Sequence, residues 1–295
     1  MYIELFGASD RMGGNISDII SQMAYAHKNK LYVKYDRKKL KVYNSYNQDY
    51  NETIFMQTLF DIIDSYNQKN PVEELDKEID LTAPTHFEVL SKSVLNIKTD
   101  LISYFKNNLY SDFYREIFLN RGKNKGYEIP FSPEKTILVH LRLEDVKNRP
   151  DYDGKICGNY FRNKIESGFF VDENTDSEIR RDNPACNMQS PIPFQRIQNI
   201  IDKELKKNPD REVIIITNPG EDLSNLPYKC ISNIDPSYDL FLLCNCETLI
   251  LSRSTFGLAS LFFGMSKKSY IPLWGLVPCY GLYTKYDNNN FDYYY

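Results

Sequence analysis

The stretch 136–145, TILVHLRLED, constrains the fold of this chain more than any other feature. Its first four residues are β-branched or apolar and predict a short buried strand. The strand leads directly into His140, Arg142 and Asp145. Ligands of open α/β sheets bind outside the carboxyl ends of the strands, so a guanidinium group there is placed to bind a phosphate or carboxylate. The alternative is a surface ion pair between Arg142 and Glu144 or Asp145.

Strand and helix patterns alternate on both sides of this stretch. The run 212–217, EVIIIT, predicts a second buried strand, and a helix over 191–207 precedes it. Alternation of this kind predicts an α/β fold with parallel strands. The other predicted elements are strands at 2–6, 31–35 and, as the last of the chain, 269–273, and helices at 16–29, 54–66, one or two within 93–119, and 258–263.

Composition limits the classes of partner. The net charge of -4 and the pI near 5.6 provide no general positive field for nucleic acid or an anionic membrane, so an anionic ligand needs a local basic cluster. The six cysteines are scattered, which favours reduced thiols, and Cys244 and Cys246 are interpreted as core residues rather than metal ligands. No run is long and apolar enough to span a membrane, and a strand pattern stands where a signal peptide would begin. We therefore expect a cytoplasmic protein.

A glycine corner precedes the first predicted helix. Gly13, Gly14 and Asn15 would let the backbone and a side-chain amide approach a ligand at the helix N-terminus. The corner lacks the full dinucleotide fingerprint, which disfavours a nicotinamide cofactor. The alternative is an ordinary glycine turn in which Asn15 or Ser17 caps the helix.

Hydroxyl groups gather at a second predicted strand-to-helix turn. Ser252, Ser254 and Thr255 precede Phe256 and Gly257, and an apolar helix follows. Hydroxyl donors together with the N–H groups of a helix N-terminus suit a phosphate. Plain capping by Ser254 or Thr255 is the alternative.

These stretches resemble the motifs of one enzyme family. His140, Arg142 and Asp145 match the HxRxxD motif of the fucosyltransferase-like glycosyltransferases, which include α-1,2, α-1,6 and protein O-fucosyltransferases. The segment 252–257 is similar to the STF segment of that family, and the 13–15 corner resembles its Gly-x-x-Gly-Asn corner. The motifs occur in the family's order.

The resemblance implies a GT-B-like fold with two Rossmann-like domains that face each other across a cleft. Residues 1–130 would form the acceptor-side domain, and residues 131–295 would bind the nucleotide sugar. The implied reaction moves a sugar from a GDP-fucose-like donor to a glycan or glycoprotein acceptor, with inversion and without a metal or cofactor.

The resemblance also implies roles for individual residues. Arg142 would bind the β-phosphate of the donor and stabilise the charge that develops as the sugar leaves. Asp145 would orient Arg142, and Asn15 would reach the sugar or its phosphate. The implied donor site comprises Gly13, Gly14, Asn15, His140, Arg142, Asp145, Ser252, Ser254, Thr255 and Phe256.

An inverting transfer also favours a base near the acceptor hydroxyl. The candidates are Glu73 and Glu74, followed by Asp76, His86 and His27, and the alternative for each is a solvated charge or a packed histidine.

Three other functions stay open. Leu143 and Ile16 depart from the family pattern, so a UDP-sugar such as UDP-xylose is an alternative donor. A non-catalytic glycan-binding protein on the same fold is the second alternative. A metal-dependent transferase that uses Asp151 and Asp153 as a DxD pair is the third, and it is disfavoured because the pair follows no buried strand.

Overall fold

The computed structural model of this protein describes residues 1–5, 12–37, 52–71, 78–79, 101–143, 191–272 and 291–294. The chain divides into two compact units, which are described separately below. Among the described residues, those up to Gly126 belong to the first unit and those from Tyr127 on belong to the second. None of the described helices is long and apolar enough to cross a bilayer.

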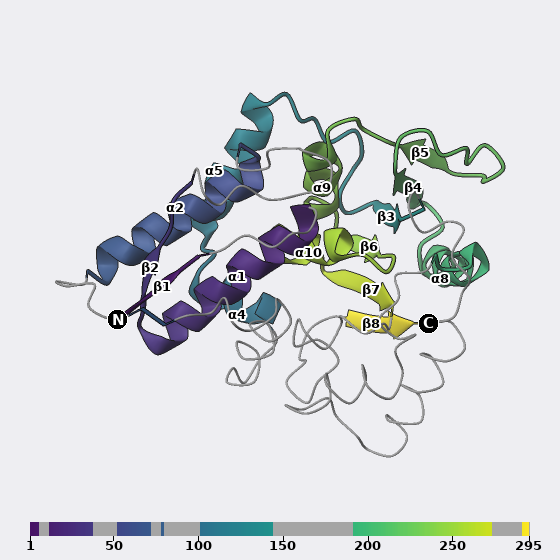
Figure 1. The fold of residues 1–295 in the computed structure, drawn as a ribbon. Helices are drawn as coiled ribbons and strands as arrows, with labels where there is room; N and C mark the ends of the chain where they lie inside the picture. Colours follow the sequence, from purple (N-terminus) through teal and green to yellow (C-terminus); the bar gives the residue numbers. More distant parts are fainter. Residues whose placement is uncertain are drawn as a thin grey trace, which may run out of the picture. The chain divides into compact units, whose positions relative to one another are not determined.

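The first unit combines a parallel strand pair with helices (Figure 1). Ile3 and Val33 are partners in the parallel register of its two strands. Helix α1 packs against α2, α4 and β2. The elements are β1 (Tyr2–Glu4), α1 (Met12–Asn29), β2 (Tyr32–Lys34), α2 (Ile54–Lys69), α4 (Leu101–Asn108) and α5 (Asp112–Asn124).

Helix α2 is fixed to β2 by polar side chains as well as by its buried apolar face. It begins after Thr53, whose hydroxyl accepts the Met56 N–H at 3.3 Å. The Asn67 side chain accepts the Val33 N–H at 3.0 Å and donates to the Val33 carbonyl at 2.7 Å. The Tyr66 hydroxyl donates to the carbonyl of Leu31 at 2.8 Å. The edge of β2 is thus paired with a helix side chain.

The second unit is built around a single sheet of six parallel strands in the order β5-β4-β3-β6-β7-β8. The chain starts at the centre with β3, moves outward to β4 and β5, and returns to the centre with β6. The sheet order is that of the doubly wound fold, and its direction reverses between β3 and β6. The elements are β3 (Thr136–Leu141), α8 (Phe194–Lys207), β4 (Glu212–Thr217), β5 (Lys229–Ile231), α9 (Pro236–Cys244), β6 (Thr248–Ile250), α10 (Thr255–Phe263), β7 (Lys268–Pro272) and β8 (Phe291–Tyr294).

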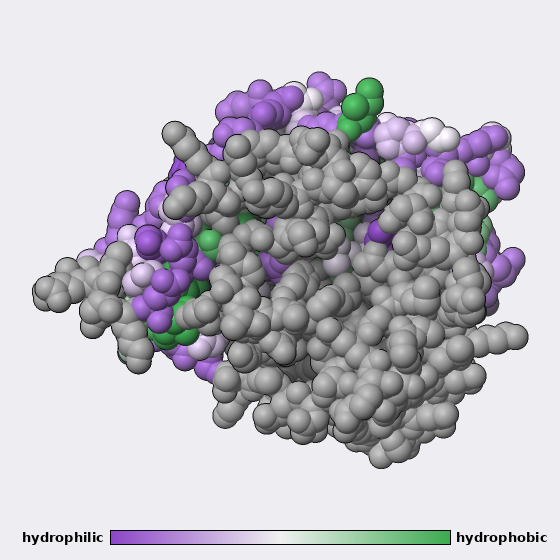
Figure 2. Space-filling model, in the orientation of Figure 1, coloured by the Kyte–Doolittle hydropathy of each residue, from purple (hydrophilic) through white to green (hydrophobic). Residues whose placement is uncertain are grey.

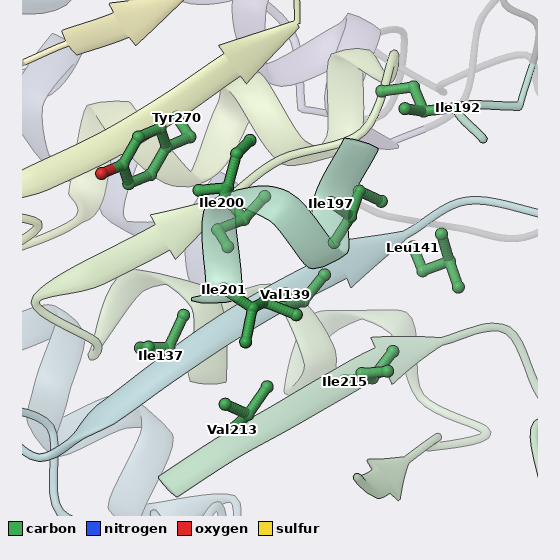
Figure 3. Close-up of a cluster of buried hydrophobic side chains, with 11 residues drawn as sticks. Ile137, Val139, Leu141, Ile192, Ile197, Ile200, Ile201, Val213, Ile215 and Tyr270 are labelled. Carbon is green, nitrogen blue, oxygen red and sulfur yellow. The ribbon is translucent and has the colours of Figure 1, made fainter. Parts of the chain in front are cut away.

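The core of this sheet is apolar on the face that α8 covers. Alternate residues of β3 and β4 meet the inner face of α8 in one buried cluster (Figure 3). The cluster contains Ile137, Val139, Leu141, Ile192, Ile197, Ile200, Ile201, Val213, Ile215, Ile250 and Tyr270. His140 points to the other face, where its ring contacts Phe256 of α10, and α10 packs on α9. The described surface seen in Figure 2 is mostly hydrophilic.

The predicted α/β class with parallel strands is confirmed, whereas several element boundaries differ. The helix predicted from residue 16 begins at Met12, and the helix predicted from residue 258 begins at Thr255. The prediction that 269–273 is the last strand is wrong, because β8 follows it. β5 was not predicted. Both missed strands are short, lie at the sheet edges and are mostly exposed or half-buried, so they lack a buried apolar run.

Candidate functional site

The candidate site lies at the carboxyl ends of β3 and β6, where the strand order reverses. Arg142 directly follows β3, and Ser252 is the second residue after β6. The two strands are hydrogen-bonded neighbours, with Val139 paired to Ile250. In doubly wound sheets the crevice at this reversal is the usual ligand site.

A single serine joins the two strand ends. The Ser252 hydroxyl oxygen accepts the backbone N–H of Arg142 at 3.1 Å and lies 2.9 Å from Nδ1 of His140. Ser252 is 110 residues from Arg142 and 112 residues from His140 in the sequence, yet the three share one hydrogen-bonded corner. The predicted donor residues His140, Arg142 and Ser252 are therefore brought together.

The same corner fixes the protonation of His140, which is only 7% exposed. Burial, and next the charge of Arg142, lowers the pKa of His140 to about 3, so the ring is neutral at neutral pH. A serine hydroxyl that accepts the Arg142 N–H still has its own proton to donate to Nδ1. The tautomer of the ring decides whether Ser252 donates to Nδ1 or accepts from it. His140 accordingly adds a neutral imidazole to the site rather than a positive charge.

The turn before α10 packs closely on this histidine. Ser254 is the N-cap of α10, and its hydroxyl accepts the Phe256 N–H at 3.2 Å. The rings of Phe256 and His140 lie 5.5 Å apart. A Cβ atom on Gly257 would stand 3.0 Å from His140 Nδ1, so only glycine fits there without a shift of the ring. Thr255 is the first helical residue and is buried.

The glycine corner of the first unit differs from its prediction. Gly13, Gly14 and Asn15 lie inside the first turn of α1 and are buried. The Ser17 hydroxyl donates to the Gly13 carbonyl at 2.8 Å, so Ser17 lies within the helix and does not cap its start. The alternative in which Asn15 or Ser17 caps a helix that begins at residue 16 is thus wrong.

The predicted base candidates are tested only in part. Nδ1 of His27 lies 2.8 Å from the Tyr104 hydroxyl, and burial lowers the His27 pKa, as for a packed histidine. The other base candidates, Glu73, Glu74, Asp76 and His86, lie outside the described part of the chain. So do Asp145, predicted to orient Arg142, and the Asp151 and Asp153 of the DxD alternative. Within the described ranges, no group of three or more His, Cys, Asp or Glu side chains could hold a metal ion.

Asp239 was missed by the sequence analysis. It lies in the first turn of α9, near the carboxyl end of β5, and is 6% exposed. Its carboxylate accepts the Asn233 side-chain N–H at 2.5 Å. Burial raises its pKa to about 7 although the hydrogen bonds from Asn233 oppose the shift. The Asp235-Pro236 pair, an N-cap followed by proline at the first helical position, is the sequence signal that would have placed it in a helix.

Comparison with known proteins gives likeness at the level of solved structures. No family model matches the chain, and no curated protein matches it. A structure of POFUT1 in complex with GDP is 11% identical, with 89% of this chain and 95% of that chain covered and a TM-score of 0.39. The fucosyltransferase NodZ from Bradyrhizobium is 11% identical, with 89% and 92% covered and a TM-score of 0.37. The activity is therefore inferred from this chain's own residues.

Proposed function

We propose that this protein is a glycosyltransferase that moves a sugar from a nucleotide-sugar donor, GDP-fucose-like, to a glycan or glycoprotein acceptor. One observation carries the proposal. Ser252 bonds the end of β3 to the turn before α10, so the residue Arg142 and a helix N-terminus are held at the point where the strand order reverses. That combination suits a diphosphate.

The chemistry of sugar transfer fits this arrangement. Negative charge builds on the departing phosphate as the bond to the sugar breaks, and a fixed guanidinium stabilises that charge more than it stabilises the ground state. We assign this role to Arg142. His140 adds a neutral imidazole, and the N-terminus of α10 adds its dipole. Because Ser254 caps α10, Thr255 is the hydroxyl that we assign to the donor.

Ligand-induced stabilisation tests the donor. The full chain is heated with GDP, UDP, GDP-fucose and UDP-xylose in turn. A ligand at 100 times its Kd stabilises the folded protein by about 2.7 kcal/mol, so the true donor gives the largest rise in Tm. A larger rise in Tm with UDP-xylose than with GDP-fucose would contradict the GDP-fucose-like donor and identify a UDP-sugar instead. If none of the nucleotides raises the Tm, the proposal that this protein is a glycosyltransferase is contradicted.

Transfer assays with Arg142 variants test the catalytic role. A lysine cannot bind a phosphate in the bidentate way of arginine, so Arg142→Lys should lower transfer about 10-fold to 100-fold and Arg142→Ala should lower it further. Arg115→Lys on α5 is the matched control and should keep full activity.

Assays in a chelator test the proposed independence from metal. Binding of nucleotide or glycan without any transfer would favour a non-catalytic glycan-binding protein.

A further inference from the structure

The N-terminus of α8 lies at the same edge of the sheet as the candidate site. A helix that connects two parallel strands runs antiparallel to them, so α8, between β3 and β4, begins at their carboxyl ends. Its N-cap is Pro193, which makes no side-chain capping hydrogen bond. The N–H groups and the positive dipole end of this helix of 14 residues are directed toward that edge.

A buried hydroxyl lies on the same side. Thr217 ends β4, pairs with Leu141 in the register and is 5% exposed. Val213 and Ile215 belong to the cluster under α8, and strand alternation places Thr217 on that face as well. Its Oγ1 is buried and has no hydrogen-bond partner among the described residues. A buried hydroxyl without a hydrogen-bond partner destabilises the fold, which points to a ligand that satisfies it.

Two guanidinium groups add positive charge. Arg196 lies in the first turn of α8, and Arg253, which is 1% exposed, follows β6. The positive charges of both lower the pKa of the hydroxyl of Tyr294, whose side chain packs against the cluster under α8. Burial raises the pKa of that hydroxyl, and the charges of Arg253 and Arg196 oppose the rise. The charges of both arginines therefore reach the hydroxyl of Tyr294.

We propose that this region is a second oxyanion site, which binds a phosphate group through the Thr217 hydroxyl, Arg196, Arg253 and the N-terminus of α8. It differs from the candidate donor site, because His140 and Phe256 contact each other on the α10 face of the sheet. The phosphate is either the second phosphate of a nucleotide or one carried by another molecule. The inference goes beyond the proposed function, since inorganic phosphate alone is a sufficient probe.

Calorimetric titration of the full chain with inorganic phosphate tests the site. The Arg142→Gln variant is the background, because it weakens the donor site. In that background we expect phosphate to bind, and Thr217→Val to weaken it about tenfold, the loss of one hydrogen bond to a charged group. Thr136→Val is the matched control, since Thr136 also has a buried Oγ1 without a partner in the described residues but stands at the amino end of β3.

Competition with GDP separates the two sources. If a nucleotide fills the site, GDP excludes inorganic phosphate and Thr217→Val weakens GDP binding. If another molecule fills it, phosphate still binds the GDP-saturated protein. Both results support the site. Two results would overturn the site. The first is equal phosphate affinity in Thr217→Val and Thr136→Val when circular dichroism shows that both variants are folded. The second is that phosphate binds neither the parent nor Arg142→Gln. Neither result depends on sugar transfer.

Discussion

Replacement of Asp239 by asparagine should change how stability depends on pH. The carboxyl group has a folded-state pKa of about 7 against an ordinary value of 3.8, because it is buried. The folded state therefore binds the proton more tightly than the unfolded state does. As pH rises from about 4 to 7, the parent loses stability, and the loss is complete above the folded-state pKa.

The size of the effect follows from the shift. Each pKa unit corresponds to about 1.4 kcal/mol, so the full shift corresponds to about 4 kcal/mol. An asparagine stays neutral and keeps an oxygen that accepts from Asn233. We compare the free energies of unfolding as Asp239→Asn minus the parent. This difference should be smallest near pH 4 and should have grown by about 4 kcal/mol once the pH is above the folded-state pKa.

Urea unfolding at a series of pH values, followed by circular dichroism, measures this difference. Asp222→Asn is the control with the opposite sign. Hydrogen bonds from Ser224 lower the pKa of Asp222, so that variant should be less stable than the parent at neutral pH, with a gap that closes in acid. A variant-minus-parent difference for Asp239→Asn that does not change with pH would refute the reasoning.

Three further variants test the packing and the site. Glu204→Gln should destabilise the protein by about 3 kcal/mol in urea unfolding, because it removes the buried partner of Arg211, and parental stability would contradict this. Gly257→Ala should weaken nucleotide binding in thermal-shift titrations, because its Cβ displaces His140; unchanged affinity would argue against the site. Ser252→Ala should lower donor affinity at least about tenfold, since it removes two hydrogen bonds at the strand ends, and calorimetry checks this.

Much of the central sheet could be predicted from the sequence, whereas its edges could not. The run 212–217 has enough buried apolar residues to identify a strand at its observed bounds. The edge strand β5 has only three residues, of which two are exposed, so no periodicity marks it. A strand of this sheet is therefore predictable where its burial is complete.

The residues of the candidate site could be predicted from the sequence, but the contacts between them could not. The motifs name His140, Arg142 and Ser252, but the hydrogen bonds of Ser252 span more than 100 residues and depend on the pairing of β3 with β6. Asp239 and Thr217 carry no motif, and their burial follows only from the assembled sheet. Local sequence patterns do not show which distant strands pair, and the contacts of the site depend on that pairing.

The pairing of β3 with β6 also has a consequence for folding kinetics. It joins segments separated by more than 100 residues, so a large loop must close before these two strands gain their hydrogen bonds. Contacts of such sequence separation slow the folding of a domain. Since Ser252 links the ends of these same two strands, we expect the ligand crevice to form late, after the separate halves of the sheet have acquired their own structure.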